Sequence, residues 1–433
     1  MQNTIHLVRT RRFLPIFVTQ FLGAFNDNLF RTSMVMLVIY GIFRNPQQEA
    51  AFSAIAGGLF ILPFFLLSAV AGQLADATDK ARIVRWVKTA EILIMIFGAA
   101  GLLLHNVPLL LAALCAMGVH STFFGPIKYA ILPQHLHDDE VLGGTGLVEA
   151  GTYIGILGGT LLGGVLVLQN PDGTYHAEWA AVAVLAVALC GWVSARFVPP
   201  APPESDAPDF KVDWHIVRAS IRLVSATLHI PRLFLAIVAI SFFWAMGAVL
   251  AAQFPPLVKN ALGSNQQVAT LFLAIFSVGV AVGSIAVNRL LQGTVSARYS
   301  PASALAMGLF VLDLYRRVKT WTNVEGAPLR DLYAFLAEPN GYWIVADLLG
   351  VAIAGGMFVV PLYAFLTTTV AKSQTARTIA ANNIVNSGFM VAATGVLTLA
   401  VLAGVTVADS LLIVAVSSVI SAWLAWRLHK ACD

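Results

Sequence analysis

Long apolar runs separated by short polar connections fill the sequence from one end to the other. A helix needs about 20 apolar residues to cross the hydrocarbon core of a bilayer, and twelve runs approach that length. Their expected starts are Phe13, Ala51, Ile83, Leu109, Leu142, Trp179, Ile230, Val268, Pro301, Trp343, Ile379 and Val407. The ninth run is short, because Asp313 and Arg316 follow its start closely. The pattern predicts an all-α membrane protein of twelve transmembrane helices.

A polar segment rich in proline divides the chain near its midpoint. Pro199–Pro203 contains four prolines and predicts an extended linker. The alternation of apolar and basic residues over Val212–Leu228 then predicts an amphipathic helix at the membrane interface. We therefore expect a six-helix bundle over residues 1–198, a cytoplasmic linker with this helix over residues 199–229, and a second six-helix bundle over residues 230–433.

The composition supports a membrane environment and excludes several classes of protein. Hydrophobic residues make up 58% of the chain and charged residues 11%, and the mean hydropathy is +0.80. A soluble domain carries roughly 25% charged residues, so this chain cannot cover a surface of its size that faces water. The composition therefore excludes a cytosolic enzyme, a disordered chain and a nucleic-acid-binding protein.

Lysine and arginine gather on alternate connections between the predicted helices. One such group follows the second predicted helix and contains Lys80, Arg82, Arg85 and Lys88. Others precede the first helix and close the chain. Loops on the cytoplasmic side carry an excess of basic residues, so we predict that both termini lie in the cytoplasm. The N-terminus lacks a short apolar stretch with a cleavage site, and we expect no cleaved signal peptide.

The first predicted helix places an acidic and a basic side chain inside the membrane. Asp27 and Arg31 are four residues apart and share one helical face, and Asn28 adjoins them. A charge at this depth costs roughly 3 kcal/mol and normally faces the bundle interior or a cavity. We expect these three residues to contact a substrate or an ion. The alternative is an internal Asp27–Arg31 pair that only neutralises itself.

Two further charges belong to the predicted fourth and fifth helices. Lys128 follows Gly125–Pro126, a dipeptide that favours a local kink whose freed carbonyl groups line a cavity. Glu149 is a lone carboxylate a few turns into the fifth helix, which makes it a functional candidate. The alternatives are a lysine that extends to the membrane surface and a glutamate that is a fixed partner of Lys128 or Arg31.

The same fifth helix carries a ridge of glycines at four-residue spacing. They are Gly151, Gly155, Gly159 and Gly163. Such a ridge lets a neighbouring helix approach closely. We interpret it as a packing surface, with a sliding surface during transport as the alternative.

The second half of the chain offers polar but uncharged candidates. Gln253 lies in the seventh predicted helix, and Asn382, Asn383 and Asn386 lie in the eleventh. We include Gln253 among the substrate-binding residues. We interpret His120 in the fourth helix as a hydrogen-bonded packing residue, with a ligand as the alternative. No phosphate-binding loop, metal cluster or Ser/His/Asp arrangement stands out, so we predict a protein that is not an enzyme, with no catalytic residue, metal or cofactor.

The connection after the second helix carries a loop motif. Gly72, Asp76, Lys80 and Arg82 resemble the loop motif of the major facilitator superfamily, although Asp79 replaces its second glycine. The resemblance implies that these four residues form a conformational latch. The alternative is a solvated basic loop.

Six segments in order resemble the bacterial lysophospholipid transporter family of the major facilitator superfamily. The likeness is strongest to members fused to acyltransferase and acyl-carrier-protein synthetase modules. The segments are Thr19–Asn28, Gly125–Leu132, Gly146–Thr152, Ser241–Gly247, Phe358–Phe365 and Ile379–Asn386. The resemblance implies two six-helix bundles around a site near the membrane midplane.

The resemblance also implies a function. A member of this family flips lysophosphatidylethanolamine and lysophosphatidylglycerol from the outer to the inner leaflet of the bacterial inner membrane, with lateral entry and alternating access. Asp27, Lys128 and Glu149 match charged positions of the family's motifs and are expected to hold the headgroup. Some members have an arginine in the seventh helix where this chain has Ala251–Gln253, so Arg31 or Gln253 would replace it.

The expected partners are lysophospholipid, membrane lipids and an acyltransferase that re-acylates the product. No acyltransferase sequence follows Asp433, so we expect that enzyme to be a separate polypeptide. The alternative function is a proton-coupled exporter of drugs or small solutes, which the loop motif and the glycine ridge would serve equally well. An intramembrane lipid-modifying enzyme lacks the required side chains.

Overall fold

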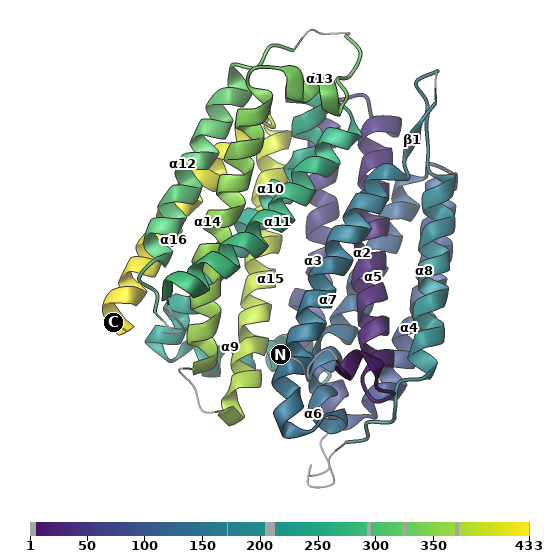
Figure 1. The fold of residues 1–433 in the computed structure, drawn as a ribbon, viewed down its shortest axis with the longest axis vertical. Helices are drawn as coiled ribbons and strands as arrows, with labels where there is room; N and C mark the ends of the chain where they lie inside the picture. The colour runs from purple at the N-terminus through teal and green to yellow at the C-terminus, as the bar shows by residue number, and fades with distance from the viewer. Residues whose placement is uncertain are drawn as a thin grey trace. The chain divides into compact units, whose positions relative to one another are not determined.

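Twelve long helices form the computed structural model, which describes residues 6–170, 172–203, 213–291, 296–323, 327–368 and 372–432 (Figure 1). They are α2 (Leu14–Met36), α3 (Pro46–Ala77), α4 (Lys80–Leu103), α5 (Val107–Ala130), α7 (Asp138–Val165), α8 (Glu178–Arg196), α10 (Pro231–Pro256), α11 (Gln266–Leu291), α12 (Ser300–Lys319), α14 (Gly341–Thr368), α15 (Lys372–Leu402) and α16 (Ser410–Cys432). Each matches one of the twelve predicted helices, so the predicted all-α fold is confirmed.

Shorter elements join or extend these helices. They are η1 (Leu7–Arg9), η2 (Leu37–Ile42), α6 (Leu132–His135), β1 (Leu168–Gln169), β2 (Tyr175–His176), α9 (Ile216–Leu228), η3 (Leu257–Ala261) and α13 (Leu332–Ala337). The antiparallel β1–β2 hairpin lies at one end of the first-half helices, and α6 lies at the other end. Both η2 and η3 are π-helical, so the first long helix of each half ends in the same unusual way.

Nine helices in the described residues are long and apolar enough to cross a membrane. This finding identifies a multi-pass membrane protein. The predicted ninth helix is present as α12, although its last turns carry charges. Arg317 bonds Asp313 at 2.7 Å and Asp347 of α14 at 3.0 Å. These ion pairs explain how a helix with a weak apolar signal packs within the fold.

The backbone contacts divide the chain into two compact units. The first contains residues 1–41 and 66–219, and the second contains residues 42–65 and 220–433. The first part of α3 therefore packs with the second half of the chain. The domain boundaries predicted after residues 198 and 229 stay a prediction.

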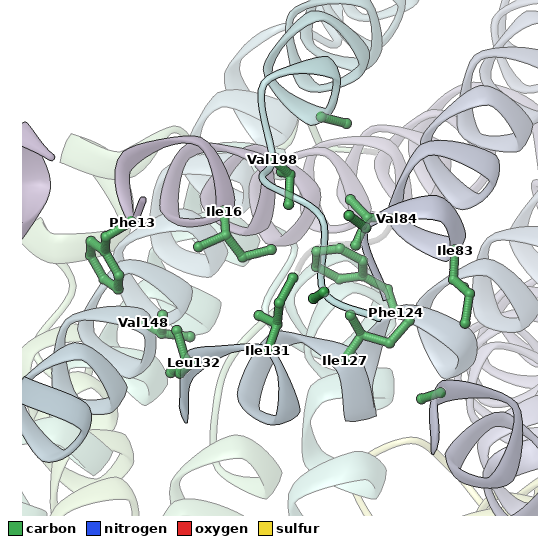
Figure 2. Packing of buried hydrophobic residues seen from close by; sticks show 14 of the residues in the cluster. Phe13, Ile16, Ile83, Val84, Phe124, Ile127, Ile131, Leu132, Val148 and Val198 are labelled. Atoms are coloured by element: carbon green, nitrogen blue, oxygen red, sulfur yellow. The ribbon is translucent and has the colours of Figure 1, made fainter. Parts of the chain in front are cut away.

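An apolar cluster at one end of α5 forms part of the core of the first unit. Figure 2 shows Phe124, Ile127 and Ile131 facing Ile16 of α2 and Val84 of α4. Residues three and four apart on a helix share a face, which is why these α5 positions point together into the cluster. The packing positions the part of α5 that begins with His120 and ends with Lys128.

The predicted glycine ridge packs α7 against α2. A methyl group on Gly159 would overlap the carbonyl oxygen of Phe25, and one on Gly163 would lie 2.7 Å from the carbonyl oxygen of Leu29. Only glycine allows the two backbones to approach this closely. The interpretation of the ridge as a packing surface is confirmed. Gly283 of α11 packs against the Ile353 carbonyl of α14 in the same way in the second unit.

Hydrogen bonds fix the polar linker on the first unit. Asp79 Oδ1 accepts from the backbone N–H groups of Ala81 at 2.9 Å and Ala201 at 3.0 Å. Beyond the linker, the Asp213 N–H donates to Gln73 Oε1 at 2.7 Å. Hydrogen bonds from Arg218 lower the pKa of Asp213 to about 2, so this carboxylate stays ionised at neutral pH.

The first prediction concerns the glycine ridge. We expect Gly159→Ala to destabilise the protein by about 1–3 kcal/mol, because α7 and α2 must separate to admit the methyl group. Thermal unfolding of the purified protein in detergent measures the effect. Gly395→Ala is the control, because a methyl group there meets nothing within 4 Å. Equal unfolding temperatures for the two variants would contradict the close contact.

Candidate functional site

Asp27 lies in the middle of α2 and faces α5. Its Oδ2 atom accepts a hydrogen bond of 2.6 Å from Ser121 Oγ. Its Oδ1 atom is buried and has no hydrogen-bond partner among the described residues. An unsatisfied carboxylate oxygen away from water is costly, and it is therefore suited to accept from a cationic or hydroxyl-bearing ligand.

The other predicted site residues of the first unit have different surroundings. Arg31 donates to Asn28 Oδ1 at 3.0 Å, and Asn28 donates in turn to the Ala24 carbonyl at 2.8 Å. The structure therefore brings Arg31 and Asn28 together on α2. Lys128 is half-buried in the last turn of α5, two turns beyond Ser121. The side chain of Glu149 lies outside the described residues.

A buried ion pair in α4 was missed by the sequence analysis. Lys88 Nζ bonds Glu91 Oε2 at 2.6 Å, and both side chains are 0% exposed. Asn26 of α2 donates to Glu91 Oε1 at 2.8 Å. The interpretation of Lys88 as a charge of the cytoplasmic loop was wrong, because its helix begins at Lys80. The i, i+3 spacing of Lys88 and Glu91 inside an apolar run was the signal that could have revealed the pair.

His120 of α5 lies between this ion pair and Ser121, the residue that bonds Asp27. Its Nε2 atom lies 3.3 Å from Glu91 Oε2, and its Nδ1 atom lies 3.4 Å from Ser121 Oγ. His120 therefore agrees with the prediction of a hydrogen-bonded packing residue, and its Nε2 atom has no hydrogen-bond partner among the described residues. Among the described residues, no group of three or more His, Cys, Asp or Glu side chains could hold a metal ion.

Gln253 belongs to the second unit. Its Nε2 atom donates to the Ala50 carbonyl of α3 at 3.3 Å, and its buried Oε1 atom has no partner in the described part of the chain. Close by in sequence, Lys259 bonds Glu49 at 2.5 Å and Asn260 donates to the same carboxylate at 2.9 Å. These contacts hold the start of α3 against the end of α10 and η3.

A second polar cluster joins three of the segments that carry the family resemblance. Trp244 Nε1 donates to the Tyr363 hydroxyl at 2.8 Å. Ser241 donates to Asn386 Oδ1 at 2.7 Å, and Asn386 Nδ2 donates to the Tyr363 hydroxyl at 3.3 Å. Asn382, one turn earlier, is fully buried, and neither of its polar side-chain atoms has a partner among the described residues. The segments therefore converge in space.

The predicted latch residues gather where α3 meets α4. Lys80 is buried and its backbone N–H donates to the Ala201 carbonyl at 3.0 Å, whereas Arg82 is exposed. A methyl group on Gly72 would meet nothing within 4 Å. The side chain of Asp76 lies outside the described residues. The latch therefore stays a prediction.

Comparison with known proteins identifies the family. The family model of the Major Facilitator Superfamily matches residues 16–394. The chain belongs to the Major Facilitator Superfamily. A crystal structure of a D-xylose-proton symporter superposes with a TM-score of 0.73 at 11% identity, covering 96% of this chain and 97% of the symporter. An inward-facing bacterial homologue of the human lysosomal transporter Spinster superposes with a TM-score of 0.66 at 15% identity, covering 97% of each chain. These likenesses concern the fold alone.

Curated relatives match most of the length of this chain. Lysophospholipid transporter LplT of Citrobacter koseri is 27% identical over 415 residues, which cover 94% of each chain. LplT of Pectobacterium carotovorum is 26% identical and covers 92% of this chain and 88% of the relative. The predicted resemblance is confirmed. The relatives are named transporters, in agreement with the prediction that this member of the superfamily is not an enzyme.

The second prediction concerns the buried ion pair. We expect Glu91→Gln to destabilise the protein by about 3–5 kcal/mol, because it leaves the Lys88 ammonium buried without a carboxylate. The double variant Lys88→Met/Glu91→Gln removes both charges and should recover most of the loss. Unfolding temperatures of the purified proteins provide the comparison.

Glu140→Gln is the matched control for this experiment. Glu140 pairs with Arg12 at 2.6 Å, but both side chains are partly exposed. Water screens such a pair, so its loss has little effect on stability. A Glu91→Gln variant as stable as Glu140→Gln would show that Lys88 does not carry a buried charge.

Proposed function

We propose that this protein flips lysophospholipids across the bacterial inner membrane. Lysophosphatidylethanolamine and lysophosphatidylglycerol would move from the outer to the inner leaflet. The observation that carries the proposal is the buried Oδ1 atom of Asp27, which has no partner in the described residues and belongs to a motif of the resemblance. The likeness to relatives named lysophospholipid transporters, which covers more than nine-tenths of this chain, supports it.

The headgroup chemistry matches the carboxylate of Asp27. Phosphoethanolamine ends in an ammonium group with three N–H donors, and phosphoglycerol ends in hydroxyl donors. Either can donate to Asp27 Oδ1, while Ser121 continues to bond Oδ2. A charge-assisted hydrogen bond in a site without water is short and strong. Asp27 therefore selects lipids whose headgroup carries a donor beyond the phosphate.

The phosphate requires a cation, and the first unit contains two candidates. Arg31 lies one turn after Asp27 and is oriented by Asn28, so its guanidinium suits the planar recognition of phosphate oxygens. Lys128 of α5 is the second candidate. Glu149 stays in the proposed headgroup set with Asp27 on the basis of its motif. Gln253 is proposed to donate to or accept from the headgroup in place of the arginine that some relatives carry.

The remaining parts of the proposal concern the membrane. We place both termini in the cytoplasm, because the basic connections favour that side. The acyl tail would enter laterally between helices and stay in apolar surroundings. Alternating access would expose the headgroup site to each leaflet in turn, with Gly72, Asp76, Lys80 and Arg82 latching one state. A separate acyltransferase would consume the flipped lipid.

The third prediction tests the headgroup site. Purified protein in liposomes should move fluorescent lysophosphatidylethanolamine between leaflets, and Asp27→Asn should slow this movement at least about tenfold, since a neutral amide loses the charge-assisted bond. Asp172→Asn is the control, because Asp172 makes the same type of carboxylate bond in an exposed turn. The appearance of lipid in the inner leaflet is measured by quenching from outside.

Each outcome of this experiment decides one point. Flipping by Asp27→Asn at the wild-type rate would remove Asp27 from the site but keep the function. Wild-type protein that does not flip lysophospholipid under sodium or proton gradients would overturn the function. Transport of a soluble cation against a proton gradient would then support the alternative, a proton-coupled exporter of drugs or small solutes.

A further inference from the structure

Two arginines lie at the end of the first unit where α4 begins and α8 ends. Arg85 belongs to the second turn of α4, and its Nη2 atom donates to the Val198 carbonyl at 3.1 Å. Arg196 is exposed and stacks on the Trp192 ring, with 4.1 Å between its Cζ atom and the ring centroid. Neither arginine forms an ion pair with a described residue. The two positive charges are therefore not neutralised by any described carboxylate.

Hydrogen bonds join the two arginines into one frame across α4 and α8. Trp192 Nε1 donates to Thr89 Oγ1 at 3.1 Å, and Thr89 Oγ1 donates to the Arg85 carbonyl at 2.8 Å. The Arg196 guanidinium lies on the same indole ring. Val198, which accepts from Arg85, belongs to the apolar cluster of the first unit (Figure 2). Packing and hydrogen bonds therefore hold both arginines close to one place on the surface.

The protein leaves most hydrogen-bond donors of these arginines unused. A guanidinium carries several N–H donors in a rigid plane, and this geometry matches the oxygens of a phosphate group. At Arg85 the Val198 carbonyl accepts from Nη2, whereas Nε is buried and has no partner among the described residues. Arg196 makes no hydrogen bond to a described residue. Two arginines with spare donors and no carboxylate beside them favour a phosphate that carries a net negative charge.

The surroundings of the arginines indicate that this phosphate belongs to a lipid. Both α4 and α8 are long and apolar enough to cross the membrane, so their ends lie at a membrane surface. Beside the arginines, Trp86, Val193 and Phe197 are exposed, and the exposed apolar face continues through Leu93 of α4 and Leu189 of α8. Aromatic side chains are typical of the membrane–water interface. Free phosphate would leave this apolar face uncovered, whereas the acyl chain of a lipid covers it.

We propose that Arg85 and Arg196 bind the headgroup phosphate of an anionic phospholipid from the surrounding leaflet, with an acyl chain along the exposed face of α4 and α8. In the orientation proposed above this is the cytoplasmic leaflet. A zwitterionic lipid binds less well, because its ammonium group adds a positive charge beside the two arginines. The inference goes beyond the proposed function, since the bound lipid stays in its leaflet and is not the lipid that is flipped.

The fourth prediction tests this lipid site. The purified full-length protein is titrated with dioctanoyl phosphatidylglycerol in detergent, and native mass spectrometry counts the bound lipid. Arg85→Gln and Arg196→Gln should each weaken binding about tenfold, because each removes charge-assisted hydrogen bonds to the phosphate. Arg196→Lys keeps the charge and should retain most of the binding. Dioctanoyl phosphatidylcholine should bind the wild type more weakly, and inorganic phosphate at the same concentration should not displace phosphatidylglycerol.

Arg427→Gln is the matched control. Arg427 of α16 stacks on the exposed Trp423 at the same four-residue spacing, but no hydrogen bond joins this indole to an arginine of another helix in the described part of the chain. Its binding of phosphatidylglycerol should match the wild type.

Three results would overturn the proposal. The first is equal binding of phosphatidylglycerol by the wild type and Arg196→Gln, a variant that loses no hydrogen bond to a described residue and should therefore fold normally. The second is an equal loss in Arg427→Gln, which would reduce the effect to a general attraction of arginines at the membrane surface. The third is displacement of phosphatidylglycerol by inorganic phosphate, or equal binding of phosphatidylcholine, because the site would then not recognise an anionic lipid.

Discussion

A lysine and a glutamate without any exposure to water keep their charges only when they stay in contact, and the Lys88–Glu91 pair of α4 meets this condition. Asn26 of α2 donates to the same carboxylate, and His120 of α5 lies beside it. The pair therefore determines which faces of α2, α4 and α5 meet. Because Ser121 follows His120 directly, the same arrangement of α5 brings the Ser121 hydroxyl to Asp27. The geometry of the candidate site thus depends on a charge pair in a neighbouring helix.

Close backbone contact stabilises the same unit where charge is absent. Gly155 and Gly159 of α7 lie directly on the backbone of α2 near Phe21 and Phe25. Dispersion contacts replace the hydrophobic effect as the force between helices in lipid, so this contact needs residues without side chains. On α2 the glycine ridge contacts Phe25 and the ion pair contacts Asn26, the two residues that directly precede Asp27.

The second unit combines neutral hydrogen bonds with ion pairs, one of which comes from the start of α3. Tyr363 accepts from Trp244 and from Asn386, whereas Glu49 bonds Lys259. The start of α3 packs with the second unit although its sequence belongs to the first half.

The sequence by itself determined the twelve helices, the membrane environment, the family and the packing role of the ridge glycines. Hydropathy and spacing are local properties, so they can be read from neighbouring residues. Only the tertiary structure decided that Lys88 is buried rather than solvated, that His120 contacts Glu91, and that Asp27 bonds Ser121. The separations between these residues, such as 94 positions between Asp27 and Ser121, follow no sequence period. They arise from helix packing, which depends on the shapes of many side chains at once.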